Sequence, residues 1–372
     1  MVIKKLIAIS VVFALVAGAA FAVDLGGAVI TSVKVAESTA GADATLFSGG
    51  GVGRARIEGS GEAEIGIGSI GGWIRFDVDT VYLGGGGDDK LVAALAWWQP
   101  IEQLRIQLSH NKDGHFDTSH IGRYGFYAQA NEIGGLVTSD GNWGSFASYD
   151  NAIFGGYDGF DFALIITPME GLTINVALPW NQTAGTDTQP AATFKKAFFQ
   201  VNYNADFGAI HVTYQGVNSA TVMGNFYANA FIGMIENLGL EVGLKFGIAA
   251  EGAPKPPLAI ALGAKYDVSE QFGVKLRSVF EIPMESGGKA NIRVDLLPYY
   301  AINESVTAYL DAGILVIGGG DTTFHIGPYV RVGSEWGPGF YAGLRIANAQ
   351  AYTATKDAKM SWSVPIGLIA QF

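Results

Sequence analysis

The sequence predicts an all-β protein, a transmembrane antiparallel up-and-down β-barrel of about 18 strands, with about 16 as the alternative. Three observations predict this class. Apolar residues alternate with small or polar ones along the extended segments, short and long connectors alternate along the chain, and 49% of residues are hydrophobic against 15% charged. So much apolar surface needs a large buried core or contact with lipid. The alternation of connector length favours the barrel, because a soluble two-sheet sandwich gives no reason for it.

The alternation defines two faces on each segment. In residues 240–248 every second side chain is apolar, and the side chains between them include Glu241 and Lys245. Because successive side chains of a strand point to opposite sides, one face would contact lipid and the other would line an aqueous interior. We predict that the inner face carries a basic wall made of Lys245, Lys265, Lys275, Arg277, Arg293, Arg331 and Arg345.

The carboxyl end repeats the pattern. In KMSWSVPIGLIAQF, apolar residues occupy alternate positions back from the last one, among them Phe372, Ala370, Leu368 and Ile366. A terminal Phe preceded by alternate apolar residues resembles the last strand of bacterial outer-membrane β-barrels. The resemblance implies that these four residues form the signal read by the barrel-assembly machinery, and that the protein lies in the bacterial outer membrane among its lipids.

The amino terminus has the layout of a secretory signal peptide. Lys4 and Lys5 precede an apolar run over residues 6–17, and a small-x-small sequence ends at Ala22. We predict a signal peptide over residues 1–22 and a single barrel domain over residues 23–372. With no cysteine, the chain has neither a disulfide framework nor a thiolate metal site, and its net charge of −11 argues against a nucleic-acid partner.

Among the connectors, short turns are predicted at residues 69–72 and 301–303, and one long loop is predicted over residues 111–159. This loop follows the fifth segment and contains Phe154-Gly155-Gly156. In position and in that tripeptide it resembles the third loop of the general diffusion porins, which folds into the barrel and narrows it. The resemblance implies that Asp150, Asp158 and Asp161 face the basic wall, so that a transverse field selects small polar solutes.

The resulting hypothesis is an outer-membrane porin for passive diffusion of small hydrophilic solutes or ions, and porin-like barrels are commonly homotrimers. The alternative is a structural or adhesive barrel whose surface loops bind host or matrix partners. No enzyme activity and no cofactor are expected. His211 and His325 leave a hydrolase open without supporting it, because a triad needs a serine beside the histidine. The cluster of His110, Asp113, His115, Asp117 and His120 has no recognised metal-site spacing, and a solvated loop explains it better.

Overall fold

One closed antiparallel sheet makes up the fold. The computed structural model describes residues 22–38, 43–48, 52–81, 90–110, 160–179, 195–320, 322–333, 338–348 and 360–371. Within them, 20 strands form a single sheet. β1 (Ala22–Ser38) pairs with β3 (Val52–Ile65) along one edge and with β20 (Ser361–Gln371) along the other, so the ring is complete. A closed sheet leaves no unpaired backbone edge, as a strand in hydrocarbon requires. The predicted all-β barrel class is confirmed.

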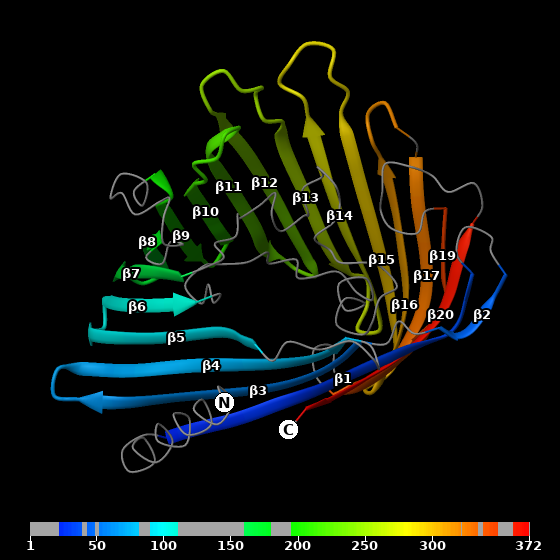
Figure 1. The fold of residues 1–372 in the computed structure, drawn as a ribbon, viewed down its shortest axis with the longest axis horizontal. Helices are drawn as coiled ribbons and strands as arrows, with labels where there is room; N and C mark the ends of the chain where they lie inside the picture. Colours follow the sequence, from blue (N-terminus) through cyan, green and yellow to red (C-terminus); the bar gives the residue numbers. More distant parts are fainter. Residues whose placement is uncertain are drawn as a thin grey trace.

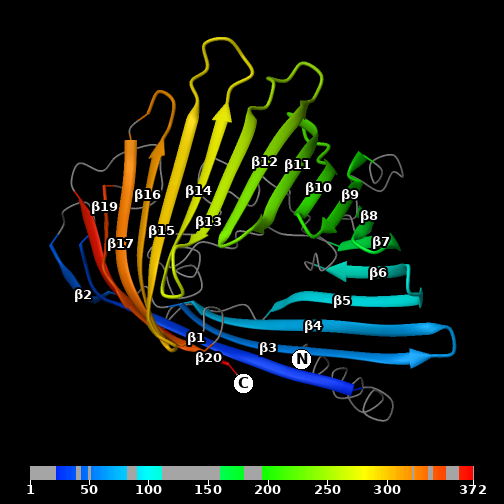
Figure 2. The same cartoon turned by 180° about the vertical axis from the view of Figure 1, so that it is seen from behind.

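The other strands follow one another around the ring. They are β2 (Thr45–Ser48), β4 (Gly68–Val81), β5 (Lys90–Ile101), β6 (Leu104–His110), β7 (Phe160–Met169), β8 (Leu172–Pro179), β9 (Phe198–Ala205), β10 (Gly208–Gly216), β11 (Val222–Ile235), β12 (Leu238–Ala249), β13 (Leu258–Asp267), β14 (Phe272–Ile282), β15 (Asn291–Asn303), β16 (Val306–Val316), β17 (Thr322–Gly333), β18 (Gly339–Gly343) and β19 (Arg345–Ala347). Figures 1 and 2 show β3 to β6 and β10 to β17 on opposite sides of this ring.

Two positions of the ring are each occupied by two strands. β2 and β3 pair with adjoining parts of the same edge of β1. β18 and β19 both lie between β17 and β20, and Leu344 separates them, its backbone N–H donating to the Pro328 carbonyl at 2.9 Å. Counting each such pair once leaves 20 − 2 = 18 positions around the ring among the described residues.

The two faces of the strands differ as the alternation predicts. On β12 the apolar side chains Val242 and Phe246 are each 47% exposed, whereas Glu241, the residue before Val242, is 1% exposed. β17 alternates without interruption between exposed and buried residues over nearly its whole length. The apolar face therefore lies on the outside of the ring, and the polar face lies inside it. No helix among the described residues has the length and apolarity to cross a bilayer.

Short and long connectors lie at opposite rims. The turns that join β3 to β4, β5 to β6 and β7 to β8 each contain only two residues between strands, at 66–67, 102–103 and 170–171. Figure 1 shows the longer loops after β12, β14 and β16 rising together from the other rim. Directly after the first of these turns, Gly68, the first residue of β4, has a φ of +83°, a left-handed conformation that other residues rarely adopt.

Two predicted turns were wrong in position. The turn predicted at residues 69–72 lies within β4, and the chain reverses at Gly66 and Ile67 instead. The turn predicted at residues 301–303 lies within β15, and the chain reverses at Glu304 and Ser305, where the Asn303 side chain accepts a hydrogen bond from the Ser305 N–H at 2.9 Å.

Packing explains why glycine occurs at residues 69–72 although these residues form a strand and not the predicted turn. Gly71 is a strand residue directly opposite Trp97, and a Cβ added to Gly71 would collide with the indole ring. The absent side chain thus lets a large aromatic ring lie flat against the inner wall. Gly273 and Tyr299 form a second pair of this kind, since they are also directly opposite each other and in the same close contact. Gly71 and Gly273 therefore make room for aromatic rings within the sheet, and they do not mark turns.

Candidate functional site: the inner wall

The predicted basic residues lie on the inner face of six strands, β12 to β15, β17 and β19. Lys275, Arg277, Arg293, Arg331 and Arg345 are buried. Lys245 and Lys265 are half-buried. The Lys245 ammonium lies 5.8 Å from the centroid of the Tyr227 ring, and the Lys265 ammonium lies 3.1 Å from a carboxylate oxygen of Asp267.

The strand register brings four of these residues together. Lys265 on β13 is directly opposite Lys275 on β14, and Arg277 on β14 is directly opposite Asp295 on β15. Arg293 precedes Asp295 by two residues on the same face of β15. Arg331 and Arg345 lie further around the ring, on β17 and β19, while Lys245 lies on β12. The basic residues therefore form a central group on β13 to β15, flanked at a distance by the others.

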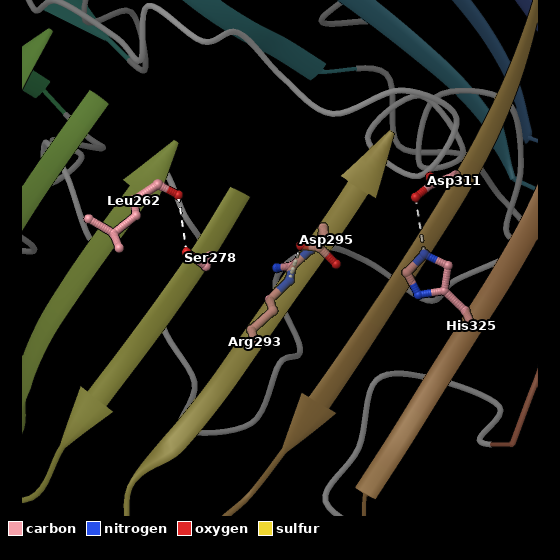
Figure 3. A network of polar contacts seen from close by, with 6 residues as sticks. All are labelled: Leu262, Ser278, Arg293, Asp295, Asp311 and His325. Atoms are coloured by element: carbon pink, nitrogen blue, oxygen red, sulfur yellow. Dashed lines mark hydrogen bonds and ion pairs between the residues drawn. The ribbon is translucent and has the colours of Figure 1, made fainter. Parts of the chain in front are cut away.

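A buried run of ionisable side chains extends this group across β15, β16 and β17 (Figure 3). The Arg293 Nε lies 2.5 Å from Asp295 Oδ2, and His325 Nε2 lies 3.1 Å from Asp311 Oδ1. Gly313 sits between the two pairs, where an added Cβ would touch both the Asp295 carboxylate and the His325 ring. Because charges removed from water need partners, the contacts within these two pairs stabilise the side chains in their buried positions on the inner wall.

Figure 3 also shows how an outward polar side chain is accommodated. Ser278 shares the outer face with apolar neighbours, and its hydroxyl donates to the Leu262 backbone carbonyl of the adjacent strand at 3.3 Å. A hydroxyl facing hydrocarbon without such a partner would be costly. The contact is consistent with a lipid environment on this side.

An uncharged hydrogen-bonded group on β8, β9 and β10 was not predicted. Asn175 and Asn202 donate from Nδ2 to Gln200 Oε1 at 3.2 and 3.0 Å, Gln200 Nε2 donates to Thr213 Oγ1 at 3.1 Å, and His211 Nδ1 lies 2.9 Å from Asn202 Oδ1. All five side chains are buried. The alternation of the sequence could have indicated this group, because these residues occupy the positions between the apolar ones. The prediction considered only charged residues at those positions, and amides carry no charge.

The predicted acidic partners of the wall lie wholly or partly outside the described residues. Asp150 and Asp158 lie outside the described residues. Asp161 lies on β7 with its backbone opposite Ser109 and Pro179, and its side chain is likewise outside the described part. The buried carboxylates among the described residues belong to Glu241, Glu281, Asp295 and Asp311. Acids and bases are thus interleaved on one wall, and the predicted opposition of a basic wall to an acidic loop stays a prediction.

Three of the four residues predicted to form the assembly signal can be placed. In β20, Ile366 and Leu368 lie on the outer face, with Leu368 48% exposed and Ile366 paired to both Val33 and Ala342. Ala370 is exposed near the strand end, and Phe372 lies outside the described residues. Their role as an assembly signal stays a prediction.

The histidines give no support to a catalytic site. His211 and His325 belong to the hydrogen-bonded wall through Asn202 and Asp311. Of the five-residue cluster that begins at His110, the other four members lie outside the described ranges. Within those ranges, no three histidine or carboxylate side chains gather as a metal site would require.

A closed antiparallel sheet with an exposed apolar exterior and a buried polar interior defines the class of transmembrane β-barrels. Within this class, the fold is similar to that of a porin from Rh. blastica. One mutant of that porin, with an alanine changed to tryptophan, aligns with a TM-score of 0.50 and 15% identity over 94% of this chain and 100% of its own. A second mutant, with a lysine and an arginine changed to alanine, gives the same values. No family model matches the sequence. No curated protein matches it either. The chain therefore has a porin-like barrel fold, distant in sequence.

Proposed function

We propose that this protein is an outer-membrane porin through which small hydrophilic solutes or ions diffuse passively. The observation that carries the proposal is the sorting of side chains in a closed sheet, with apolar residues such as Val242 and Leu244 exposed outside and charged residues inside. A water-soluble barrel would have no reason for an exposed apolar band on strand after strand. The likeness of the fold to the Rh. blastica porin supports the same function.

The proposal includes the surroundings that such a protein needs. Residues 1–22 would direct secretion, and the barrel-assembly machinery would insert residues 23–372 into the outer membrane among its lipids. Residues 111–159 would narrow the lumen and set Asp150 and Asp158 opposite the basic group. A homotrimer would suit the exposed apolar exterior. Selectivity would follow from the lumen charges, because fixed charges close to a narrow passage favour solutes of opposite sign.

Conductance tests the proposal directly. Purified mature protein, folded in detergent and added to a planar lipid bilayer, should produce discrete and reproducible conductance steps. The same protein unfolded by heating should produce none. If correctly folded protein, verified by resistance to SDS before heating, gives no steps at any concentration that inserts, passive diffusion through the barrel is excluded.

Ion preference tests the role of the basic group. Lys275→Gln combined with Arg277→Gln removes two buried cations from the inner face, so the reversal potential in a salt gradient should shift toward cation preference. As a matched control, Lys255→Gln changes a lysine in the loop between β12 and β13 that is exposed to solvent. An equal shift in both variants would show that the potential reports overall charge and gives no information about a lumen wall.

A further inference from the structure

Two arginines on the inner wall stack on aromatic rings in a similar way. The Arg105 guanidinium on β6 lies 4.2 Å from the centroid of the Trp97 ring, and the Arg331 guanidinium on β17 lies 5.4 Å from the centroid of the Tyr341 ring. In each pair the aromatic residue comes from the neighbouring strand. Such stacking holds the planar guanidinium by one face and leaves the N–H groups at its edge to be satisfied by acceptors.

The two arginines differ in the hydrogen-bond acceptors that their Nε and Nη2 atoms contact. Arg105 donates from Nε at 3.2 Å and from Nη2 at 3.0 Å to the same atom, Gln99 Oε1. In Arg331 the corresponding two atoms, Nε and Nη2, are buried and have no hydrogen-bond acceptor in the described part of the chain. Arg331 is also only 3% exposed, so bulk water does not solvate it. Within the described residues, the edge of Arg105 has an acceptor from its own chain and the edge of Arg331 has none.

A buried guanidinium edge without an acceptor is energetically unfavourable. Burying an ion without a partner is strongly unfavourable, and an arginine always keeps its charge, so a change of protonation cannot relieve the cost. The Nε and Nη2 edge presents two parallel donors, whose geometry matches two oxygens on one carbon or phosphorus atom. A carboxylate or phosphate therefore supplies what Gln99 supplies at Arg105, with opposite charge in addition.

Gly339 lies beside the guanidinium and places no side chain next to it. A Cβ added to Gly339 would lie 2.8 Å from the Val332 carbonyl oxygen, 3.7 Å from Arg331 Nε and 3.7 Å from a ring carbon of Tyr341, so a larger residue would crowd this side of the guanidinium. Arg331 also lies close to the end of β17, two residues before Gly333, where the chain leaves the sheet for a connector. Arg331 is therefore close to the rim that carries the short turns.

We propose that Arg331, stacked on Tyr341, binds a small oxyanion of the carboxylate or phosphate class on the inner wall of the barrel. The inner face excludes a lipid headgroup as the source, so the ligand is a free solute. Its binding is a property of the folded barrel and does not require that solutes cross the membrane. A failure of conductance would therefore leave this site untouched, and the two proposals are tested separately.

Binding to the mature full-length protein, folded in a zwitterionic detergent, tests the site with inorganic phosphate as the probe. We expect saturable broadening of the phosphate ³¹P resonance, competed by acetate and much less by chloride at equal ionic strength. Arg331→Gln should weaken binding at least about tenfold, because two charge-assisted hydrogen bonds are lost. Arg331→Lys should give an intermediate loss, since the charge remains while the two-donor edge is lost.

Arg105→Gln is the matched control. It also removes a stacked arginine from the inner wall, but one whose edge already has an acceptor, so phosphate binding should stay within about twofold of the wild type. All variants are first checked for SDS resistance before heating, and Arg331→Lys keeps the test valid if Arg331→Gln does not fold. Absence of saturable binding by the wild type, or equal losses in the Arg105 and Arg331 variants, would overturn the proposal.

Discussion

Replacing Leu262 by arginine tests the assignment of the outer face. Leu262 is an exposed side chain, 38% accessible, and is the fifth residue of the ten in β13. At a rise of about 3.4 Å per residue and a tilt of about 40°, the five residues that follow Leu262 as far as Asp267 span about 13 Å along the membrane normal, or about half of a ~25 Å apolar band. Leu262 then lies near the bilayer midplane, where an arginine costs about 2–4 kcal/mol.

The assay is urea unfolding of the barrel in lipid vesicles, followed by tryptophan fluorescence, with Val268→Arg as the depth control. Val268 is 52% exposed in the short connector between β13 and β14, so the same kind of substitution lies at the interface and should cost only about 0–1 kcal/mol. Equal losses of stability in the two variants would refute the reasoning, because cost would then not depend on depth in a lipid band.

Three further predictions concern the inner face. Gly71→Ala should lower the free energy of unfolding by about 1–3 kcal/mol by displacing Trp97, whereas Gly66→Ala, whose new Cβ meets nothing within 4 Å, should change it little; urea titration of both decides. Asp295→Ala should cost about 3–5 kcal/mol in the same assay because it removes a buried partner of Arg293, and a cost below about 1 kcal/mol would contradict the charged run. Lys265→Gln should fold normally, since its bond to Asp267 is partly exposed, and should move the reversal potential toward cations; an unchanged potential would place Lys265 away from the conducting path.

The barrel could be predicted because the same weak signal recurs. One amphipathic strand fits many folds, yet the segments that contain Val242, Leu276 and Ile326 all put apolar residues on one face and charges on the other. Connector lengths add an independent signal, because turn length depends on the rim and has no link to strand composition. Both signals survive an error of several residues in any boundary, so the misplaced turns did not alter the fold class.

Details that depend on contacts between strands could not be predicted. Gly71 and Gly72 have the composition of a turn, and only the position of Trp97 on the next strand shows why Gly71 lies within a strand. The alternation placed Asp295 and Arg277 on one face, but their direct opposition depends on the register of β14 and β15, which the sequence pattern does not determine. The amide group around Gln200 was overlooked for a different reason, since neutral polar residues carry no charge pattern.

The position of the basic residues on the inner face could be predicted, and their role as a selective wall stays a prediction. Five of the basic residues chosen from the alternation are buried on the inner face, which follows from the period of two alone. Their relation to Asp150 and Asp158 depended on a resemblance carried by three residues of a long loop, and that relation lies outside the described part of the chain. The pairing of Arg331 with Tyr341 depends on the register of β17 and β18, and a guanidinium edge without an acceptor leaves no trace in a sequence.

The most direct measurement of the outer face is quenching by brominated acyl chains along β17. The chain has no cysteine, so single cysteines carrying a fluorophore can be placed without background at Phe324, Ile326 and Val330 on the exposed face and at Thr323 and Gly327 on the buried face. In bilayers of brominated lipid we expect strong quenching at the first three positions and weak quenching at the other two. Uniform quenching along the strand, or strong quenching at Thr323 and Gly327 alone, would contradict a barrel whose apolar face contacts lipid.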